Sequence, residues 1–170
     1  MQKKFIVNNK EYTVLKLLGH GKSGYSYKVI DKQNKIYTLK KIHHEPCEYY
    51  KFGDKFRSEL DDYDTLKDFV LMPKIYDFDA NQEIIIKEFI DGINISEMIE
   101  RKDNIDIQVT LIKQIAKVCY KHGINIDYYP TNFIYFNEKL YYVDYECNKY
   151  MKEWDFENWG IKHWSINSHQ

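Results

Sequence analysis

The chain has 170 residues, a length that fits one domain or a small lobe packed on another. Its 25 Lys and Arg against 26 Asp and Glu give a net charge of −1, which disfavours nucleic acid as a partner. No stretch approaches the roughly 20 apolar residues of a membrane span. The cysteines, Cys47, Cys119 and Cys147, show no CxxC spacing, so a reducing cytoplasm is the expected location.

The first half of the chain has the pattern of an antiparallel sheet with one helix. Alternating or β-branched runs predict strands at residues 12–18, 25–30, 35–42, 75–78 and 84–90. Between the third and fourth strands, apolar residues recur every three or four positions over residues 49–69, which predicts a helix with one packed face. The sequence therefore predicts five strands and one helix in this half.

The second half reads as mainly helical. Residues 96–101 form a short predicted helix, and residues 106–122 form a longer one with Asp106 as N-cap and Gly123 just past its end. Two strands follow, at residues 133–136 and 140–143. The tryptophans of residues 153–166 predict a closing helix wedged into the core.

Residues 19–24 (GHGKSG) fit the pattern GxGxxG, which is weak alone. A Rossmann loop needs a helix directly after the glycines, and here a strand follows. A Walker A loop fails for the same reason, and its first glycine would fall at Lys16. Two interpretations remain: a plain hairpin turn, or a loop whose backbone approaches phosphate oxygens closely because no Cβ intervenes.

Two charged residues fall among apolar positions of this half. Lys40 lies in the predicted third strand, and Glu59 shares a helical face with Phe56 and Tyr63. A charge set among core residues needs a partner, so we expect Glu59 to pair with Lys40, with Glu48 as the other candidate.

Asp127, Asn132 and Asp144 flank the predicted hairpin of the second half. Symmetric pairing about residue 138 would bring Asn132 and Asp144 face to face, where their oxygens suit Mg²⁺. Asp127 would then be placed to accept a hydroxyl proton. The alternative is that Asp127 and Asn132 only cap turns.

In this order and spacing, the residues resemble the protein-kinase-like phosphotransferases over roughly residues 17–144. Residues 18–29 look like the glycine-rich loop, and Lys40 and Glu59 like the phosphate lysine and its helix glutamate. Residues 87–92 (KEFIDG) look like the hinge, residues 122–133 like the catalytic loop, and Asp144 stands at the metal-binding DFG position.

The resemblance implies an α+β, two-lobed fold with a five-stranded antiparallel N-lobe (residues 1–90) and a truncated, mainly helical C-lobe (residues 91–170). It also implies ATP and Mg²⁺ as cofactors. The catalytic residues would be Asp127, Lys40 and Asn132, and the metal ligands Asn132 and Asp144. The implied ATP-binding residues are Gly19, Gly21, Gly24, Val29, Lys40, Glu59, Glu88 and Ile90.

Departures from the kinase pattern leave the acceptor and the activity open. The usual His-Arg before the catalytic aspartate is Asn125-Ile126, the lysine two residues after it is Tyr129, and the DFG motif ends in Tyr145-Glu146. With few residues after Asp144, the chain looks like a minimal kinase similar to RIO, lipopolysaccharide-core and small bacterial Ser/Thr kinase-like groups. We expect phosphate transfer to a hydroxyl of a protein. The alternatives are a small-molecule kinase and a pseudokinase.

A metal is also suggested by residues 43–47, where His43, His44 and Glu45 precede Cys47. The set lies in the connection before the long helix and lacks a second ligand pair. A zinc site is therefore disfavoured on the sequence.

Overall fold

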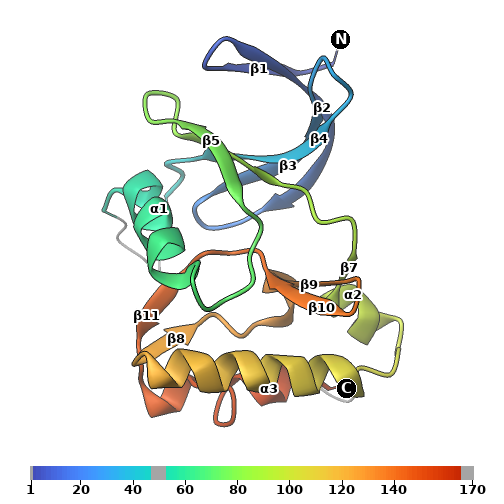
Figure 1. The fold of residues 1–170 in the computed structure, drawn as a ribbon, viewed down its shortest axis with the longest axis vertical. Coiled ribbons are helices and arrows are strands. Elements are labelled where there is room, and N and C mark those ends of the chain that lie inside the picture. The colour runs from blue at the N-terminus through green and yellow to red at the C-terminus, as the bar shows by residue number, and fades with distance from the viewer. Residues whose placement is uncertain (1, 47–52, 166–170) are drawn as a thin grey trace. The chain divides into compact units, whose positions relative to one another are not determined.

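The computed structural model describes residues 2–46 and 53–165, and Cys47, Glu48 and the first residues of the predicted helix lie outside these ranges. The protein is α+β, as expected, with a curled antiparallel sheet and few helices (Figure 1). Its contacts divide it into two compact units. The first comprises Met1–Ser58 with Pro73–Phe89, and the second Glu59–Met72 with Ile90–Gln170.

The first unit is built on one antiparallel sheet with strand order β1-β2-β3-β4-β6-β5. Its strands are β1 (Lys4–Val7), β2 (Lys10–His20), β3 (Gly24–Ile30), β4 (Ile36–Ile42), β5 (Ile75–Asp79) and β6 (Ile84–Glu88). One face buries an apolar cluster of Val7, Tyr12, Val29, Tyr37, Leu39, Ile84 and Ile86. Burial of these side chains is the main stabilising term of the sheet.

The prediction of five strands was wrong, because the sheet has six. The missed strand, β1, is an edge strand of four residues, and Ile6 within it is 62% exposed. The turn to β2 uses two residues with positive φ, Asn8 and Asn9. Asparagine tolerates that conformation, so the Asn-Asn pair was the available signal for this hairpin.

Helix α1 covers Lys55–Leu66, a shorter stretch than the predicted residues 49–69. The Asp54 carboxylate accepts a hydrogen bond from the Arg57 backbone N–H, at 2.9 Å, as an N-cap does. The part from Glu59 onward belongs to the second unit, where the Phe69 ring stacks on His122 at 3.9 Å between centroids.

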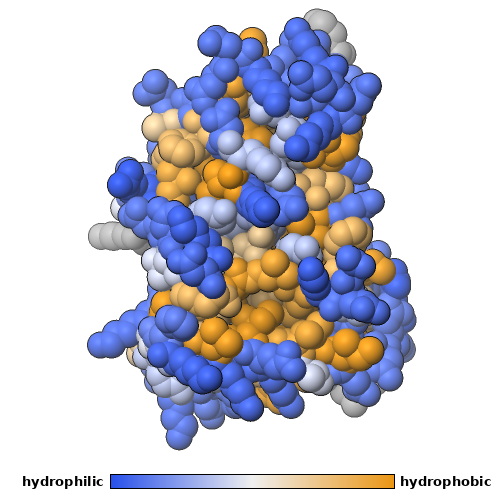
Figure 2. Space-filling model, in the orientation of Figure 1, coloured by the Kyte–Doolittle hydropathy of each residue, from blue (hydrophilic) through white to orange (hydrophobic). Residues whose placement is uncertain are grey.

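The second unit combines helices with two small sheets. Its helices are α2 (Ile95–Glu100) and α3 (Asp106–Lys121). Strands β7 (Ile93–Asn94), β9 (Phe133–Phe136) and β10 (Lys139–Tyr142) form one sheet, and β8 (Ile124–Ile126) pairs with β11 (Cys147–Lys149). Hydrophobic side chains gather where β9 and β10 lie, whereas the surface over α1 is hydrophilic (Figure 2).

Of the two predicted ends of α3, the C-terminal one is confirmed and the N-terminal one is wrong. Gly123 has φ +69° just past the helix, a conformation that glycine adopts without cost. At the start, the N-cap is Ile105 and not Asp106. The side chain of Asn104 accepts the Asp106 backbone N–H at 2.9 Å, so the polar cap comes from two residues earlier than predicted.

The predicted C-terminal helix was also wrong for the described part, residues 153–165. The chain there forms two short 3-10 turns, η2 (Lys152–Trp154) and η3 (Gly160–His163). The buried Asp155 carboxylate accepts both the backbone and the side-chain N–H of Asn158, a local bond that competes with helix formation. Of the tryptophans, Trp164 is buried as expected, but Trp154 is 54% exposed.

Both cysteines of the described residues, Cys119 and Cys147, are free thiols. Burial raises the pKa of each to about 12. We predict that iodoacetamide at pH 8 alkylates them at least about 100-fold more slowly in the folded protein than in urea, because the thiolate is the nucleophile. Peptide mass spectrometry over time measures this. Equal rates in both states would contradict the burial of these thiols.

Candidate active site

Asp127 lies in the loop between β8 and the 3-10 turn η1 (Pro130–Asn132). Its carboxylate accepts the Tyr129 backbone N–H at 3.1 Å. The loop is held from within the unit, because the Trp164 indole N–H donates to the Tyr128 carbonyl at 2.7 Å and the Tyr128 side chain is fully buried. A Cβ on Gly160 would lie 2.8 Å from the Cβ of Tyr128, so glycine is required beneath this loop.

The Tyr142 hydroxyl fixes both chain segments that carry the carboxylates. It accepts the Asp127 backbone N–H at 3.1 Å and donates to the Glu146 carbonyl at 2.7 Å. Tyr142 is fully buried, and burial together with the nearby Asp144 carboxylate holds the pKa of its hydroxyl well above the usual range. The hydroxyl therefore remains a neutral donor at every working pH.

Three carboxylates converge next to this hydroxyl. Asp127, Asp144 and Glu146 each present an oxygen within 4.8 Å of the others, and all three side chains are half-buried. Like charges this close repel one another, and a cation between them would relieve that repulsion.

The donor set fits Mg²⁺. Mg²⁺ is a hard cation that prefers carboxylate oxygens, keeps several waters and takes phosphate oxygens for the rest of its shell. One or two of these carboxylates suffice to hold it. The cluster contains no imidazole or thiolate that would select a softer metal.

The predicted pairing of Asn132 with Asp144 was wrong by one residue. Tyr142 is the partner of Phe133, and the Val143 backbone N–H donates to the Asn132 carbonyl at 2.9 Å, so Asn132 faces Val143. The shift arises because the turn is two residues long, with positive φ at Asn137 and Glu138, instead of being centred on residue 138. The Asn132 side-chain amide donates to the Asp127 carbonyl at 3.3 Å.

Glu146 is the residue that sequence reasoning missed. It counted only as a departure from the DFG motif, at the position of its glycine. The available signal was the spacing Asp144-x-Glu146, since alternate residues of an extended chain face the same way. Tyr145 between them is fully buried and packs on Tyr63, 4.9 Å between ring centroids.

The glycine loop of the first unit connects β2 and β3 as a hairpin, as expected. Its glycines differ in what requires them. A Cβ on Gly24 would lie 2.6 Å from the Lys41 carbonyl oxygen of β4, so strand packing alone explains this glycine. A Cβ on Gly19 would meet nothing within 4 Å, and one on Gly21 only the Gly24 carbonyl at 3.9 Å. Packing therefore does not explain Gly19 and Gly21.

The structure places the other predicted nucleotide residues as follows. Lys40 is buried on β4, and Val29 lies in the apolar cluster of the same sheet. Glu88 ends β6, where its backbone N–H donates to the Lys74 carbonyl at 2.8 Å. Glu59 on α1 and Ile90 are buried and belong to the second unit. The pairing of Lys40 with Glu59 and the nucleotide roles of all these residues stay predictions.

No family model matches the chain. The chain is 25% identical over 149 residues to the serine/threonine-protein kinase MPS1 of Saccharomyces cerevisiae. The match covers 82% of this chain but 19% of the yeast protein, so the chain spans about a fifth of that relative's length. The chain is thus distantly similar to a Ser/Thr protein kinase. No helix among the described residues is long and apolar enough to cross a membrane.

We predict that Tyr142→Phe lowers the free energy of unfolding by about 1–3 kcal/mol. The change leaves the Asp127 N–H and the Glu146 carbonyl without their partner while keeping the buried ring. Urea unfolding followed by fluorescence measures it. Tyr141→Phe, on the adjacent half-buried residue of β10, serves as control. Equal effects of the two changes would contradict the role given to the Tyr142 hydroxyl.

A second prediction separates the loop glycines. Gly24→Ala should destabilise the protein by about 1–3 kcal/mol, because the new methyl group collides with β4. Gly19→Ala should leave stability within about 0.5 kcal/mol, since its site is open. Thermal unfolding of both variants tests this, and a destabilised Gly19→Ala would show that packing requires that glycine too.

Proposed function

We propose that the chain is an ATP- and Mg²⁺-dependent phosphotransferase that transfers the γ-phosphate to a hydroxyl. The observation that carries the proposal is the convergence of Asp127, Asp144 and Glu146 in the second unit. The similarity to a Ser/Thr protein kinase supports the same class of reaction.

In this proposal the second unit holds the metal and orients the acceptor. Asp144 and Glu146 supply carboxylate oxygens to Mg²⁺, with Asn132, the last residue of η1, as a further ligand. An Mg²⁺ ion held by these residues would supply neutralisation of the negative charge on the transferring phosphate. Asp127 accepts or orients the acceptor hydroxyl proton. Its backbone is held by Tyr142 on one side and Asn132 on the other, so its carboxylate starts from a fixed position.

The first unit binds the nucleotide in this proposal. Gly19 and Gly21 bring backbone N–H groups to the phosphates, which accounts for two glycines that packing does not require. Lys40 contacts phosphate oxygens. The Glu88 backbone holds the adenine, and Val29 and Gly24 shape the loop that covers it.

The acceptor we propose is a Ser or Thr hydroxyl of a protein, in line with the named activity of the yeast relative. Tyr129 stands where Ser/Thr kinases carry a lysine that contacts the transferring phosphate. It is 37% exposed beside Asp127, so an apolar ring takes the place of that cation. We therefore expect slower transfer than a kinase with the lysine would give.

The central test is Asp127→Asn in a radiolabelled ATP assay that scores both transfer to the chain or to a mixed protein acceptor and release of phosphate to water. Loss of a general base costs about 10²- to 10⁴-fold in rate. ATP binding, followed by calorimetry, should change by less than about threefold, because this residue acts on the acceptor. Asp68→Asn, an exposed aspartate outside the cluster, is the matched control.

Two results would contradict the proposal. Wild-type turnover in Asp127→Asn would remove Asp127 from the chemistry. ATP binding by a wild-type chain that neither transfers nor releases phosphate would instead favour a nucleotide-binding pseudokinase.

A further prediction concerns Glu146→Gln, which removes one negative charge without changing side-chain size. The Mg²⁺ concentration for half-maximal activity should rise by about 10-fold or more, because the ion loses a carboxylate contact. Glu153→Gln, an exposed residue away from the cluster, should leave it unchanged. An unaltered Mg²⁺ dependence in Glu146→Gln would exclude Glu146 as a ligand.

A further inference from the structure

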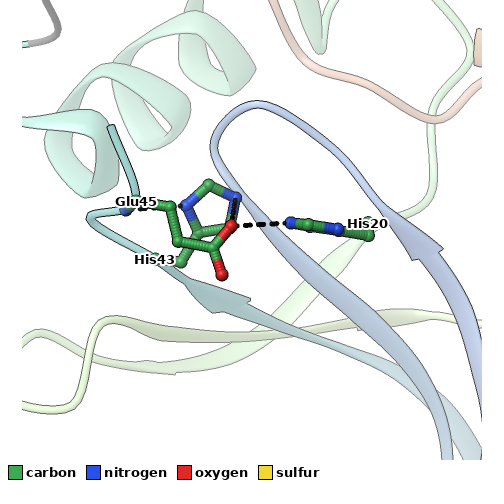
Figure 3. Close-up of side chains that lie close together, drawn as sticks. All are labelled: His20, His43 and Glu45. Carbon is green, nitrogen blue, oxygen red and sulfur yellow. Dashed lines mark hydrogen bonds and ion pairs between the residues drawn. The ribbon is translucent and has the colours of Figure 1, made fainter. Parts of the chain in front are cut away.

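A second cluster of metal-ligating side chains lies in the first unit. His20 ends β2, and His43 and Glu45 follow directly after β4 (Figure 3). Strand β3 lies between β2 and β4, and its pairing brings the ends of these two strands together, with His20 opposite Tyr25 and Tyr25 opposite Lys41. His20 and His43, which are 23 positions apart in the sequence, thus lie in one cluster.

The geometry of the cluster suits a small divalent ion. The Nε2 atoms of His20 and His43 lie 2.9 Å and 3.7 Å from the same Glu45 carboxylate oxygen, Oε2. Neighbouring ligand atoms around a tetrahedral Zn²⁺, with bonds of about 2.1 Å, are roughly 3.4 Å apart. The two observed separations lie on either side of that value, so small side-chain movements would bring the three atoms to it.

Tyr25 holds two of the three side chains in place. Its ring stacks on the His20 imidazole, with 4.2 Å between centroids and 10° between planes. Its hydroxyl donates to Oε1 of Glu45, which leaves Oε2 facing the two imidazoles. A hydrogen bond to the second carboxylate oxygen is the usual outer-shell support of a metal ligand.

The hydrogen bonds of His43 define what a metal must replace. The Glu45 backbone N–H donates to His43 Nδ1 at 3.2 Å, so Nδ1 is the unprotonated nitrogen of the neutral ring. His43 Nε2–H then donates to the Gly21 carbonyl at 2.7 Å. A metal at Nε2 requires the tautomer with the proton on Nδ1, so its binding replaces both of these hydrogen bonds while the neutral ring keeps its one proton.

We propose that His20, His43 and Glu45 form a binding site for a zinc-class divalent ion. Two imidazoles and a carboxylate suit Zn²⁺, Co²⁺ or Ni²⁺ and discriminate against Mg²⁺, which prefers oxygen ligands. An open pocket of about 360 Å³ is lined by these residues with Gly21, Lys22 and Pro46, and it leaves room for a further ligand such as water. This inference does not depend on the proposed phosphotransfer.

Such an ion would tie the glycine loop to the segment after β4. In its absence the connection consists of hydrogen bonds among exposed or half-buried groups, which contribute little each. Lys22 lines the pocket, and its positive charge opposes the binding of a cation there. The Lys55 ammonium donates to the His43 and Lys22 carbonyls. His20 supplies the ligand that the sequence pattern of residues 43–47 lacked.

The test is Co²⁺ absorption spectroscopy and Zn²⁺ calorimetry on the tag-free, nucleotide-free chain, with Mg²⁺ in excess throughout. We expect one ion per chain and a Co²⁺ spectrum without the charge-transfer band of a cobalt–thiolate bond. His20→Ala and Glu45→Gln should each weaken Zn²⁺ binding by more than about 10-fold. The matched control is His44→Ala, because His44 is exposed and contacts Glu83 outside the cluster.

Three outcomes would overturn the proposal. One is the absence of Zn²⁺ binding by a wild-type chain that unfolds cooperatively. Another is unchanged affinity in both His20→Ala and Glu45→Gln. The third is a cobalt–thiolate band, or equal loss of affinity in His44→Ala, either of which would place the ion elsewhere.

Discussion

The Tyr142 hydroxyl is the interaction on which the candidate active site depends. It accepts a hydrogen bond from the Asp127 backbone and donates one to the Glu146 backbone, and the Tyr142 side chain itself is fully buried. Repulsion among three carboxylates would otherwise move these segments apart. The two hydrogen bonds of the Tyr142 hydroxyl are partly buried, and each joins it to a backbone group. They hold the two segments that carry the carboxylates close together without involving the carboxylates themselves.

In the glycine loop, strand packing requires one of the three glycines and does not require the other two. Gly24 is required by the approach of β4, so the third glycine of the pattern is explained by the sheet. Gly19 and Gly21 have no such explanation, and His20 between them points toward Glu45 in a separate cluster (Figure 3). Under the two proposals made above, this one hairpin would hold a phosphate at its backbone and a divalent ion at its side chains.

Sequence patterns predicted the parts of the fold that local periodicity controls. Helix α3, the strands with alternating burial and the turn at Gly123 all follow from apolar spacing and glycine chemistry. The missed features depend on tertiary context. The exposed edge strand β1 has little apolar signal, and the buried Asp155 redirects the C-terminal segment toward 3-10 turns. For the site, a two-residue turn shifted the register by one, which put Val143 opposite Asn132. Glu146 was missed because it stands at the glycine position of the DFG motif, and its approach to Asp127 depends on tertiary structure.

The most direct test of the phosphotransfer account is a thermal-shift titration with ATP, with and without Mg²⁺. At about 100 times Kd, binding adds roughly 2.7 kcal/mol to the free energy of unfolding, which raises Tm by several degrees in a chain of this size. The account predicts that this rise requires Mg²⁺ and is lost in Asp144→Asn. A rise of equal size without the metal, or no rise with ATP at all, would contradict it.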